Sequence, residues 1–320
     1  FLLSHSLQNR RLVCVCGSVL LRRTKSTRQM MSVLVFLPFF CSMAITNDVA
    51  LITFVPFAIT VLRMAEQEKL LIPVVALQTL AANLGSMLTP LGNPQNLYLY
   101  RLSGLRLSAF LTLMLPYVLL SGGALALLLV FRRRESLRFT PAEVRPGNTR
   151  GLLCCALGFV LCMLALAELL PAPAVAAVVL LFLLFADRGL LRSLDYSLLC
   201  TFLAFFVFIG NMERVEPFRL WLRSTLAGNE LPAAVLTSQV ISNVPAALLL
   251  SGFTSDWRAL IVGCNLGGLG TLIASMASLI SYKQLAGAYP ALRTRYLLYF
   301  TLLSLLLLGA LYACAVLLDG

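Results

Sequence analysis

Charged residues are scarce in this chain of 320 residues, since Asp, Glu, Lys and Arg together make up only 12% of it. A soluble domain of this length carries about a quarter of its residues as charged side chains, because its surface faces water. Hydrophobic residues account for 60% of the chain. The scarcity of charge excludes an ordinary soluble protein and favours an integral membrane protein, whose helical spans need about 20 apolar residues each.

Histidine is almost absent, with His5 the single example. One histidine near the start of the chain gives no basis for a histidine-based catalytic triad or a histidine-ligated metal centre. The nine cysteines are not spaced as zinc ligands or as a disulfide framework. Five of them lie inside apolar segments: Cys41, Cys162, Cys200, Cys264 and Cys314. The sequence thus predicts no enzyme and no cofactor other than a coupling ion.

The formal net charge of +12 would also fit a nucleic-acid-binding protein. The basic residues, however, form short clusters between apolar runs, as the positive-inside rule expects of cytoplasmic loops. The main clusters are Arg22, Arg23, Lys25 and Arg28; Arg132, Arg133, Arg134 and Arg138; Arg188 and Arg192; and Lys283, Arg293 and Arg295. We therefore expect the lipid bilayer as a partner, and no nucleic acid.

The first half of the chain contains apolar runs that are too short to cross a membrane. Residues 33–45 and 49–62 are two such runs, and the polar residues Asn47 and Asp48 lie between them. The first run would reach about 20 Å as a helix, short of the roughly 30 Å hydrocarbon core. Two short helices joined at a polar tip predict a re-entrant hairpin over 33–62, with its tip near the middle of the membrane.

A spanning helix that is broken at its centre is expected after the hairpin. The apolar stretch 70–100 is interrupted by TPLGNPQN, and proline breaks the hydrogen-bond ladder of a helix. Such a break is tolerated only where the freed backbone groups face protein or a water-lined cavity. A full span at 108–131 and a basic cytoplasmic linker at 136–150 follow. We take 1–135 as the first half, beginning with an interfacial helix at 12–21.

The second half, 151–320, repeats this order after additional spans. The expected elements are scaffold spans at 151–211, an interfacial helix at 212–230, a hairpin at 231–253, a broken helix at 258–287 and a full span at 295–317. The same order of hairpin, broken helix and span in both halves indicates a repeat. The fold class expected is an all-α polytopic membrane protein.

Short sequence matches relate the two halves. The tripeptide N-L-G begins at Asn83 and again at Asn265, and a threonine follows each asparagine by six residues. The hairpin tips correspond as Thr-Asn at 46–47 and Ser-Asn at 242–243. If the dense basic clusters lie in the cytoplasm, the hairpins enter from opposite sides. The halves are then inverted repeats, which are typical of alternating-access transporters.

These motifs resemble those of the ion-transporter superfamily, which includes divalent-anion:sodium symporters, citrate carriers, arsenite permeases and a branch of sodium/proton antiporters. The similar segments are ITNDVALITFVPFAI, NLGSMLTPLGNPQNLYLY, SNVPAALLL and NLGGLGTLIASMASLI. The resemblance covers residues 30–135 and 195–317. Relatives carry scaffold spans before the first hairpin, so it implies a missing N-terminal segment. It also implies a homodimer formed through the scaffold.

The resemblance implies two cation sites, each made of a hydroxyl, an amide and freed main chain, with the substrate between the tips. A desolvated ion needs such groups in place of water. Sodium is expected at Thr46, Asn47 and Gly92, and at Ser242, Asn243 and Gly270 beside Thr271. The wider set of expected substrate- or ion-binding residues is Asp48, Asn83, Thr89, Pro90, Asn93, Pro94, Asn96, Val244, Pro245, Asn265, Gly267, Thr271 and Ser275.

Two positions depart from the Ser-Asn-Thr tip of the symporters. Asp48 and Val244 stand where those proteins have a hydroxyl that helps to hold a substrate carboxylate. A carboxylate within the membrane is a functional candidate in its own right, and it repels a dianion unless it is protonated or bound to a cation. The Thr-Asn-Asp tip is closer to the arsenite permease and antiporter branches.

The leading hypothesis is a secondary active transporter of a small anion or oxyanion, carboxylate- or arsenite-like, coupled to sodium or protons. The alternative is a sodium/proton antiporter that uses Asp48. More remote alternatives are a channel and a non-transporting membrane protein, in which the polar residues serve as interhelical hydrogen bonds or helix caps. The expected location is the bacterial cytoplasmic membrane.

Overall fold

The chain was analysed as a computed structural model, which describes residues 21, 24–136, 157–158, 160–161, 164–165, 169–186, 196–212 and 214–319. Within these residues all regular secondary structure is helical, apart from one isolated bridge between Ser26 and Ser136. The expected interfacial helix at 12–21 and most of the expected linker and of the first scaffold span lie outside the described residues. The all-α prediction is confirmed.

The chain divides into two compact units, residues 1–23 with 141–200 and residues 24–140 with 201–320. In the first unit the structure describes the apolar helix α9 (Ala172–Ala186), and α11 (Tyr196–Met212) runs across the boundary in the sequence. Both helices coincide with expected scaffold spans. The second unit contains the helices that correspond to the expected hairpins and broken helices.

The first hairpin consists of α3 (Thr27–Cys41) and α4 (Asn47–Met64). Ser26 caps α3 by accepting a hydrogen bond from Gln29 N, as serine does at a helix start. Helix α4 is longer than the expected run 49–62, because Asn47 and Asp48 belong to its first turn. An acidic residue is favourable there, since it meets the positive end of the helix dipole.

The expected break in the next helix is present. Helix α5 (Leu71–Ser86) follows the short η1 (Glu68–Leu70), and α6 (Pro94–Ser103) begins after an irregular segment. A side chain at Gly92 would lie 2.0 Å from the Ser86 carbonyl oxygen, so the turn there requires glycine. Pro94 starts α6 at a position where its missing N–H is not needed.

Among the described residues, the second half contains five further α-helices before its final long one. It contains the surface helix α12 (Glu216–Leu226), the pair α13 (Glu230–Ile241) and α14 (Asn243–Ser251), and the pair α15 (Trp257–Leu266) and α16 (Met276–Ala288). The long α7 (Leu107–Val130) closes the first half, and α17 (Arg293–Asp319), after η2 (Pro290–Leu292), closes the second.

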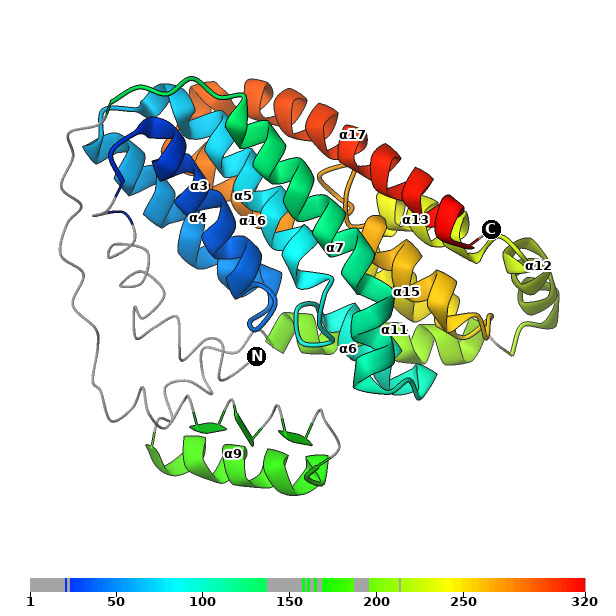
Figure 1. Cartoon of the computed structure of the whole chain (residues 1–320). Helices are drawn as coiled ribbons and strands as arrows, with labels where there is room; N and C mark the ends of the chain where they lie inside the picture. The colour runs from blue at the N-terminus through cyan, green and yellow to red at the C-terminus, as the bar shows by residue number, and fades with distance from the viewer. Residues whose placement is uncertain are drawn as a thin grey trace. The chain divides into compact units, whose positions relative to one another are not determined.

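The two halves are interlocked through their broken helices. Helix α5 is at the centre and packs against α3, α4, α7, α16 and α17. Helix α16 of the second half thus lies beside α4 and α5 of the first, while α6 of the first half packs against α14 and α15 of the second (Figure 1). Each half contributes one helix to the core of the other.

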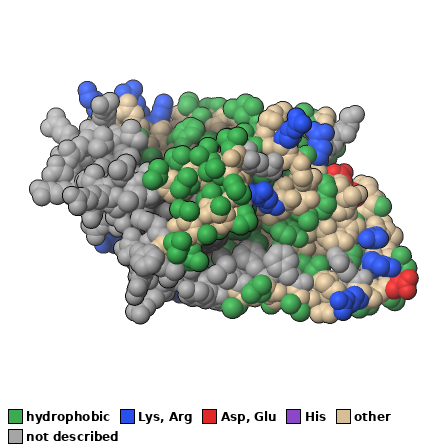
Figure 2. Space-filling model, turned by 90° about the horizontal axis from the view of Figure 1, so that it is seen from below, with side chains coloured by type: hydrophobic (Ala, Val, Ile, Leu, Met, Phe, Trp, Pro, Cys, Tyr) green, Lys and Arg blue, Asp and Glu red, His purple; other side chains and the backbone are tan. Residues whose placement is uncertain are grey.

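The surface of the second unit is suited to lipid. Four of its described segments are long and apolar enough to cross a membrane: Asn47–Met64, Glu68–Ser86, Leu107–Val130 and Pro290–Leu318. Large apolar side chains stand exposed on α7 and α17, among them Leu119 and Leu306. Hydrophobic side chains cover broad areas of the face in Figure 2. These features agree with an integral membrane protein.

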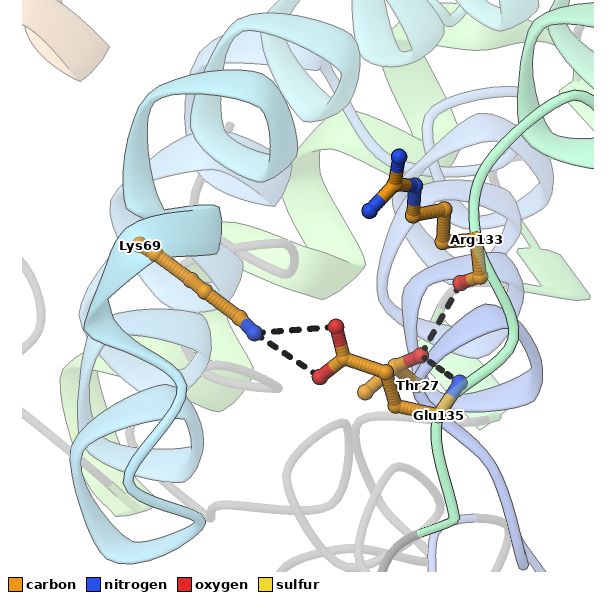
Figure 3. A network of polar contacts seen from close by, with 4 residues as sticks. All are labelled: Thr27, Lys69, Arg133 and Glu135. Atoms are coloured by element: carbon orange, nitrogen blue, oxygen red, sulfur yellow. Dashed lines mark hydrogen bonds and ion pairs between the residues drawn. The ribbon is translucent and has the colours of Figure 1, made fainter.

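A polar network fastens the start of α3 to the segment after α7 (Figure 3). The Thr27 hydroxyl donates to the Arg133 carbonyl oxygen at 3.2 Å and accepts from Glu135 N at 3.1 Å. Lys69, in η1, forms an ion pair of 2.8 Å with the Glu135 carboxylate. The network fixes the first hairpin relative to α7 at its open end, opposite the tip.

Candidate functional site

The first hairpin tip is fastened to the broken helix by Asn47, whose residue surface is 4% exposed. Its side-chain Nδ2 donates to Asn83 Oδ1 on α5 at 2.9 Å, and its main-chain N–H donates to the Gly92 carbonyl oxygen at 3.0 Å. Its Oδ1 accepts from Asp48 N at 2.9 Å. The sequence predicted that Asn47 and Gly92 lie together, and the structure brings them into contact.

The second tip makes the equivalent main-chain contact. Asn243, 5% exposed, donates from its N–H to the Ala274 carbonyl oxygen at 3.0 Å. Ala274 follows Asn265 by nine residues, as Gly92 follows Asn83. The sequence analysis had chosen Gly270 as the counterpart of Gly92.

Gly270 occupies a different place from the one expected. It has a φ of 104°, and its N–H donates to Ser304 Oγ on α17 at 2.6 Å. The hydrogen bond that corresponds to Asn47–Gly92 is thus made by Ala274, while the sodium site expected at Gly270 stays a prediction. Alanine serves equally well where the backbone has a negative φ.

The two tips are connected through Asn83. Its Oδ1 accepts a second hydrogen bond, from Ser275 Oγ at 3.2 Å, and its Nδ2 donates to Ser278 Oγ at 3.2 Å. Ser275 directly follows Ala274, which holds the other tip. A path of five residues therefore runs from Asn47 to Asn243, made of three hydrogen bonds and the peptide bond between Ala274 and Ser275.

The second N-L-G asparagine makes the reciprocal contact. Asn265 Nδ2 donates to Asn96 Oδ1 at 2.6 Å and to the Ile261 carbonyl oxygen at 2.8 Å. Asn96 follows Asn83 by thirteen residues, and Ser278 follows Asn265 by thirteen. Each asparagine thus bonds across the molecule to the same position in the other half.

The paired threonines attach each broken helix to the hairpin of its own half. Thr89 Oγ1 donates to the Met43 carbonyl oxygen at 2.5 Å, and Thr271 Oγ1 donates to the Gln239 carbonyl oxygen at 3.3 Å. Met43 and Gln239 each lie three residues before the hydroxyl residue of the tip. These hydroxyls therefore have a structural partner, and each keeps an acceptor lone pair for further contacts.

The glycines of the two N-L-G motifs allow the close approach of hairpin and broken helix. A Cβ at Gly85 would lie 2.0 Å from the Phe39 carbonyl oxygen, and one at Gly267 would lie 2.5 Å from Ser238 Oγ. Neither position has room for a larger residue. The sequence analysis had included Gly267 among the binding residues, and the structure gives it a packing role.

The remaining predicted residues lie around the breaks and tips. Asn93 precedes α6 and donates from Nδ2 to Ser86 Oγ at 2.7 Å. Pro90 lies in the first break, Pro94 begins α6, and Val244 and Pro245 lie in the first turn of α14.

Several buried polar atoms near these segments have no hydrogen-bond partner in the part of the chain that the structure describes. Among them are Thr46 Oγ1, Asn265 Oδ1 and both polar atoms of the Gln95 side chain. Gln95 belongs to the interrupting segment TPLGNPQN, where the sequence leaves a helix-capping role and a binding role open, and it is not among the expected binding residues. Thr46 Oγ1 is available as a ligand beside Asn47.

The charge at the site is small. Asp48 is half-buried at the first tip, and within the described residues it forms no ion pair. No group of three His, Cys, Asp or Glu residues in the described ranges could hold a metal ion. A cation at the tips would therefore meet hydroxyl, amide and main-chain oxygens, which are hard ligands suited to sodium rather than to transition metals.

A family model described as "Citrate transporter" matches residues 1–255 of the chain. The chain belongs to the citrate transporter family. This family falls within the ion-transporter superfamily whose motifs the sequence resembles, so the predicted relationship is confirmed. Membership supports a membrane transporter and gives no support to an enzyme.

Two proteins similar to this chain are also named as a transporter or a membrane protein. One is an uncharacterized transporter, MJ0456, of Methanocaldococcus jannaschii, 32% identical over 270 residues that cover 82% of this chain and 73% of the relative. The other is the inner membrane protein YbiR of Escherichia coli, 31% identical over 291 residues that cover 84% of this chain and 73% of the relative. Neither name specifies a solute.

Proposed function

We propose that the protein is a secondary active transporter of a small anion or oxyanion, coupled to sodium or protons by alternating access. The observation that carries the proposal is the path from Asn47 to Asn243, which consists of hydrogen bonds through Asn83 to Ser275, the peptide bond to Ala274, and a hydrogen bond from Asn243. It joins two polar hairpin tips within an otherwise apolar helical unit. Such convergence of broken helices is how many secondary transporters build their binding sites.

The proposal includes two inverted repeats with re-entrant hairpins. Three kinds of contact support the repeat, because each occurs in both halves at equal sequence offsets: tip amide to break carbonyl, threonine to hairpin carbonyl, and asparagine to the opposite broken helix. The inversion is supported by the basic clusters, which fall on one side of the membrane only if the hairpins enter from opposite faces.

Helix starts favour an anionic solute between the tips. Helices α4 and α14 begin at Asn47 and Asn243, and α6 and α16 begin directly after the two breaks. The start of a helix carries a partial positive charge and unpaired N–H groups. Four such starts lie near the path, whereas no Lys or Arg is found among the buried residues that the structure describes.

The coupling cations have candidate ligands at both tips. Thr46 Oγ1 has no partner and lies next to Asn47, whose N–H is bonded to the Gly92 carbonyl oxygen. At the second tip the corresponding groups are Ser242, Asn243 and the Ala274 carbonyl oxygen. We propose these two groups as sodium sites, with Ala274 taking the role first expected of Gly270.

The name of one relative supports a location in the cytoplasmic membrane, since YbiR is described as an inner membrane protein. We propose the same membrane for this chain. A homodimer, formed through the scaffold spans, is proposed on the resemblance to the superfamily alone.

The test is solute uptake into proteoliposomes with and without a sodium or proton gradient. We expect gradient-dependent, saturable uptake that is lost in an Asn47→Ala, Asn243→Ala double variant. Asn211→Ala is the matched control, because Asn211 is exposed on α11 and its Nδ2 bonds only within that helix. Full uptake by the double variant would remove the tips from the mechanism.

Asp48 carries a second candidate function, sodium/proton exchange. It is half-buried, lies one residue from the amide that binds Asn83, and has no cationic partner among the described side chains. A carboxylate in such surroundings is suited to bind a proton and a sodium ion alternately. An Asp48→Asn variant should lose sodium-driven proton movement in everted vesicles, and retained exchange would eliminate this candidate.

A further inference from the structure

Gln95 is the most unusual polar residue of the described chain. It is the second residue of α6, it is 1% exposed, and neither Oε1 nor Nε2 has a hydrogen-bond partner. Buried polar side chains in proteins are nearly always paired. A glutamine with both polar atoms unpaired therefore requires an explanation other than folding.

A second unpaired carboxamide lies on a neighbouring element. Asn265 Oδ1 is buried without a partner, although its Nδ2 is bonded to Asn96, the residue next to Gln95. Helix α6 packs against α15, which carries Asn265, and against α14. The two unpaired side chains thus come from opposite halves and lie on elements in direct contact.

This arrangement is present on one side of the repeat only. Ala277 follows Asn265 by twelve residues, as Gln95 follows Asn83, so the second half has no counterpart of Gln95. Asn83 Oδ1, the counterpart of Asn265 Oδ1, is occupied by Asn47 and Ser275. The hydrogen bonds between the two halves, from Asn83 to Ser278 and from Asn265 to Asn96, do not involve Gln95.

The chemistry of the unpaired atoms defines their ligand. Together they offer two carbonyl oxygens, which accept hydrogen bonds, and one NH₂ group, which donates. Carbonyl oxygens do not bind an ionised oxygen, because both carry partial negative charge. A ligand atom that contacts either carbonyl oxygen therefore belongs to an O–H or N–H group.

We propose that Gln95 is a specificity-determining residue, which together with Asn265 Oδ1 binds a hydroxyl or other protonated group of the transported solute. This inference rests on the proposed transport function and adds a residue that the paired motifs do not identify. It assigns the anionic part of the solute to the helix starts and the hydrogen-bond-donating part to the two carboxamides.

The test uses two tricarboxylates that differ in one group, citrate and tricarballylate, which lacks the hydroxyl of citrate. Wild-type proteoliposomes should take up citrate with the lower KM. In Gln95→Met, which keeps the side-chain length, the KM for citrate should rise about threefold to tenfold, the loss of one hydrogen bond. The KM for tricarballylate should change less than twofold, so the preference disappears.

Unfolding separates binding from a structural role. Gln95→Met loses no protein hydrogen bond, so its unfolding midpoint in detergent should equal or exceed that of the wild type. The matched control is Gln78→Met, because Gln78 is equally buried but donates to the Leu34 carbonyl oxygen at 2.8 Å. Its midpoint should fall.

Each result has a distinct meaning. An unchanged ratio of the two KM values in Gln95→Met overturns this inference while wild-type uptake leaves the transporter proposal standing. A lower midpoint in Gln95→Met also overturns it, since Gln95 would then be a structural residue. If the wild type takes up neither tricarboxylate, the proposal that Gln95 binds a hydroxyl of the solute is overturned. The transporter proposal is then tested separately by the ion-gradient uptake assay.

Discussion

Replacing Asn83 by alanine is expected to destabilise the protein far more than replacing Asn265, although each of the two residues begins an N-L-G tripeptide. Asn83 makes three side-chain hydrogen bonds to other helices, to Asn47, Ser275 and Ser278. Asn265 makes one such bond, to Asn96, and keeps an unpaired Oδ1. The two Asn→Ala variants therefore remove the same side chain but different numbers of hydrogen bonds to other helices.

The magnitudes follow from the number of interhelical bonds lost. Such bonds in membrane proteins contribute about 0.6 kcal/mol on average and about 1.7 kcal/mol at most. Asn83→Ala should therefore lower the free energy of unfolding by about 2–4 kcal/mol. Asn265→Ala should lower it by about 0–1 kcal/mol, because the variant also removes an unpaired buried oxygen.

The assay is unfolding in mixed micelles of dodecyl maltoside and SDS, followed by tryptophan fluorescence. Both variants and the wild type are measured under one condition, so the comparison does not depend on the absolute scale. An equal or larger loss in Asn265→Ala would refute the assignment of Asn83 as the central connection between the tips.

Three further predictions concern folding and the free energy of unfolding. Gly85→Ala should prevent accumulation of folded protein, because its Cβ would lie 2.0 Å from the Phe39 carbonyl oxygen. Gly123→Ala should fold normally, because no atom lies within 4 Å of the added Cβ. Normal folding of both variants would contradict the close approach of α5 to α3. Thr27→Val should lower the free energy of unfolding by about 1–2 kcal/mol because it loses two hydrogen bonds. Lys69→Ala breaks an exposed ion pair and should lower it by less than about 1 kcal/mol. The reverse order would contradict the contacts drawn in Figure 3. Tyr289→Phe loses exposed hydrogen bonds with Arg63 at the end of α4 and with Glu68 in η1. It should also cost less than about 1 kcal/mol, so a larger loss would indicate burial.

The order of the helices could be predicted from the sequence because apolar runs and breaks are local features. Gly92 and Pro94 mark the first break directly, and the structure begins α6 at Pro94. The extent of α4 was underestimated, since polar residues in a first helical turn look like part of a loop. Its boundary depends on the hydrogen bond from Asn47 to Gly92, which is not visible in a local pattern.

The candidate site could be predicted only in part. Repeat matching identified Asn83 and Asn265, but it could not give their different numbers of partners, which depend on packing between segments about 190 residues apart. Matching by residue type selected Gly270 in place of Ala274. Gln95 lies in the predicted break but is not among the expected binding residues, because its distinguishing property is the lack of a partner in a buried place, and burial of a polar residue leaves no sequence pattern.

The exchange of helices between the halves has a consequence for biosynthesis. Helix α16 lies close to the C-terminal end of the chain, yet it supplies Ser275 and Ser278 as two of the three partners of Asn83. A nascent chain that has emerged only as far as Ser251 therefore holds α5 in lipid with an incompletely paired amide. Helix α5 therefore reaches its final hydrogen bonding only after Ser275 and Ser278 have been translated, so truncations that remove these two serines should destabilise α5.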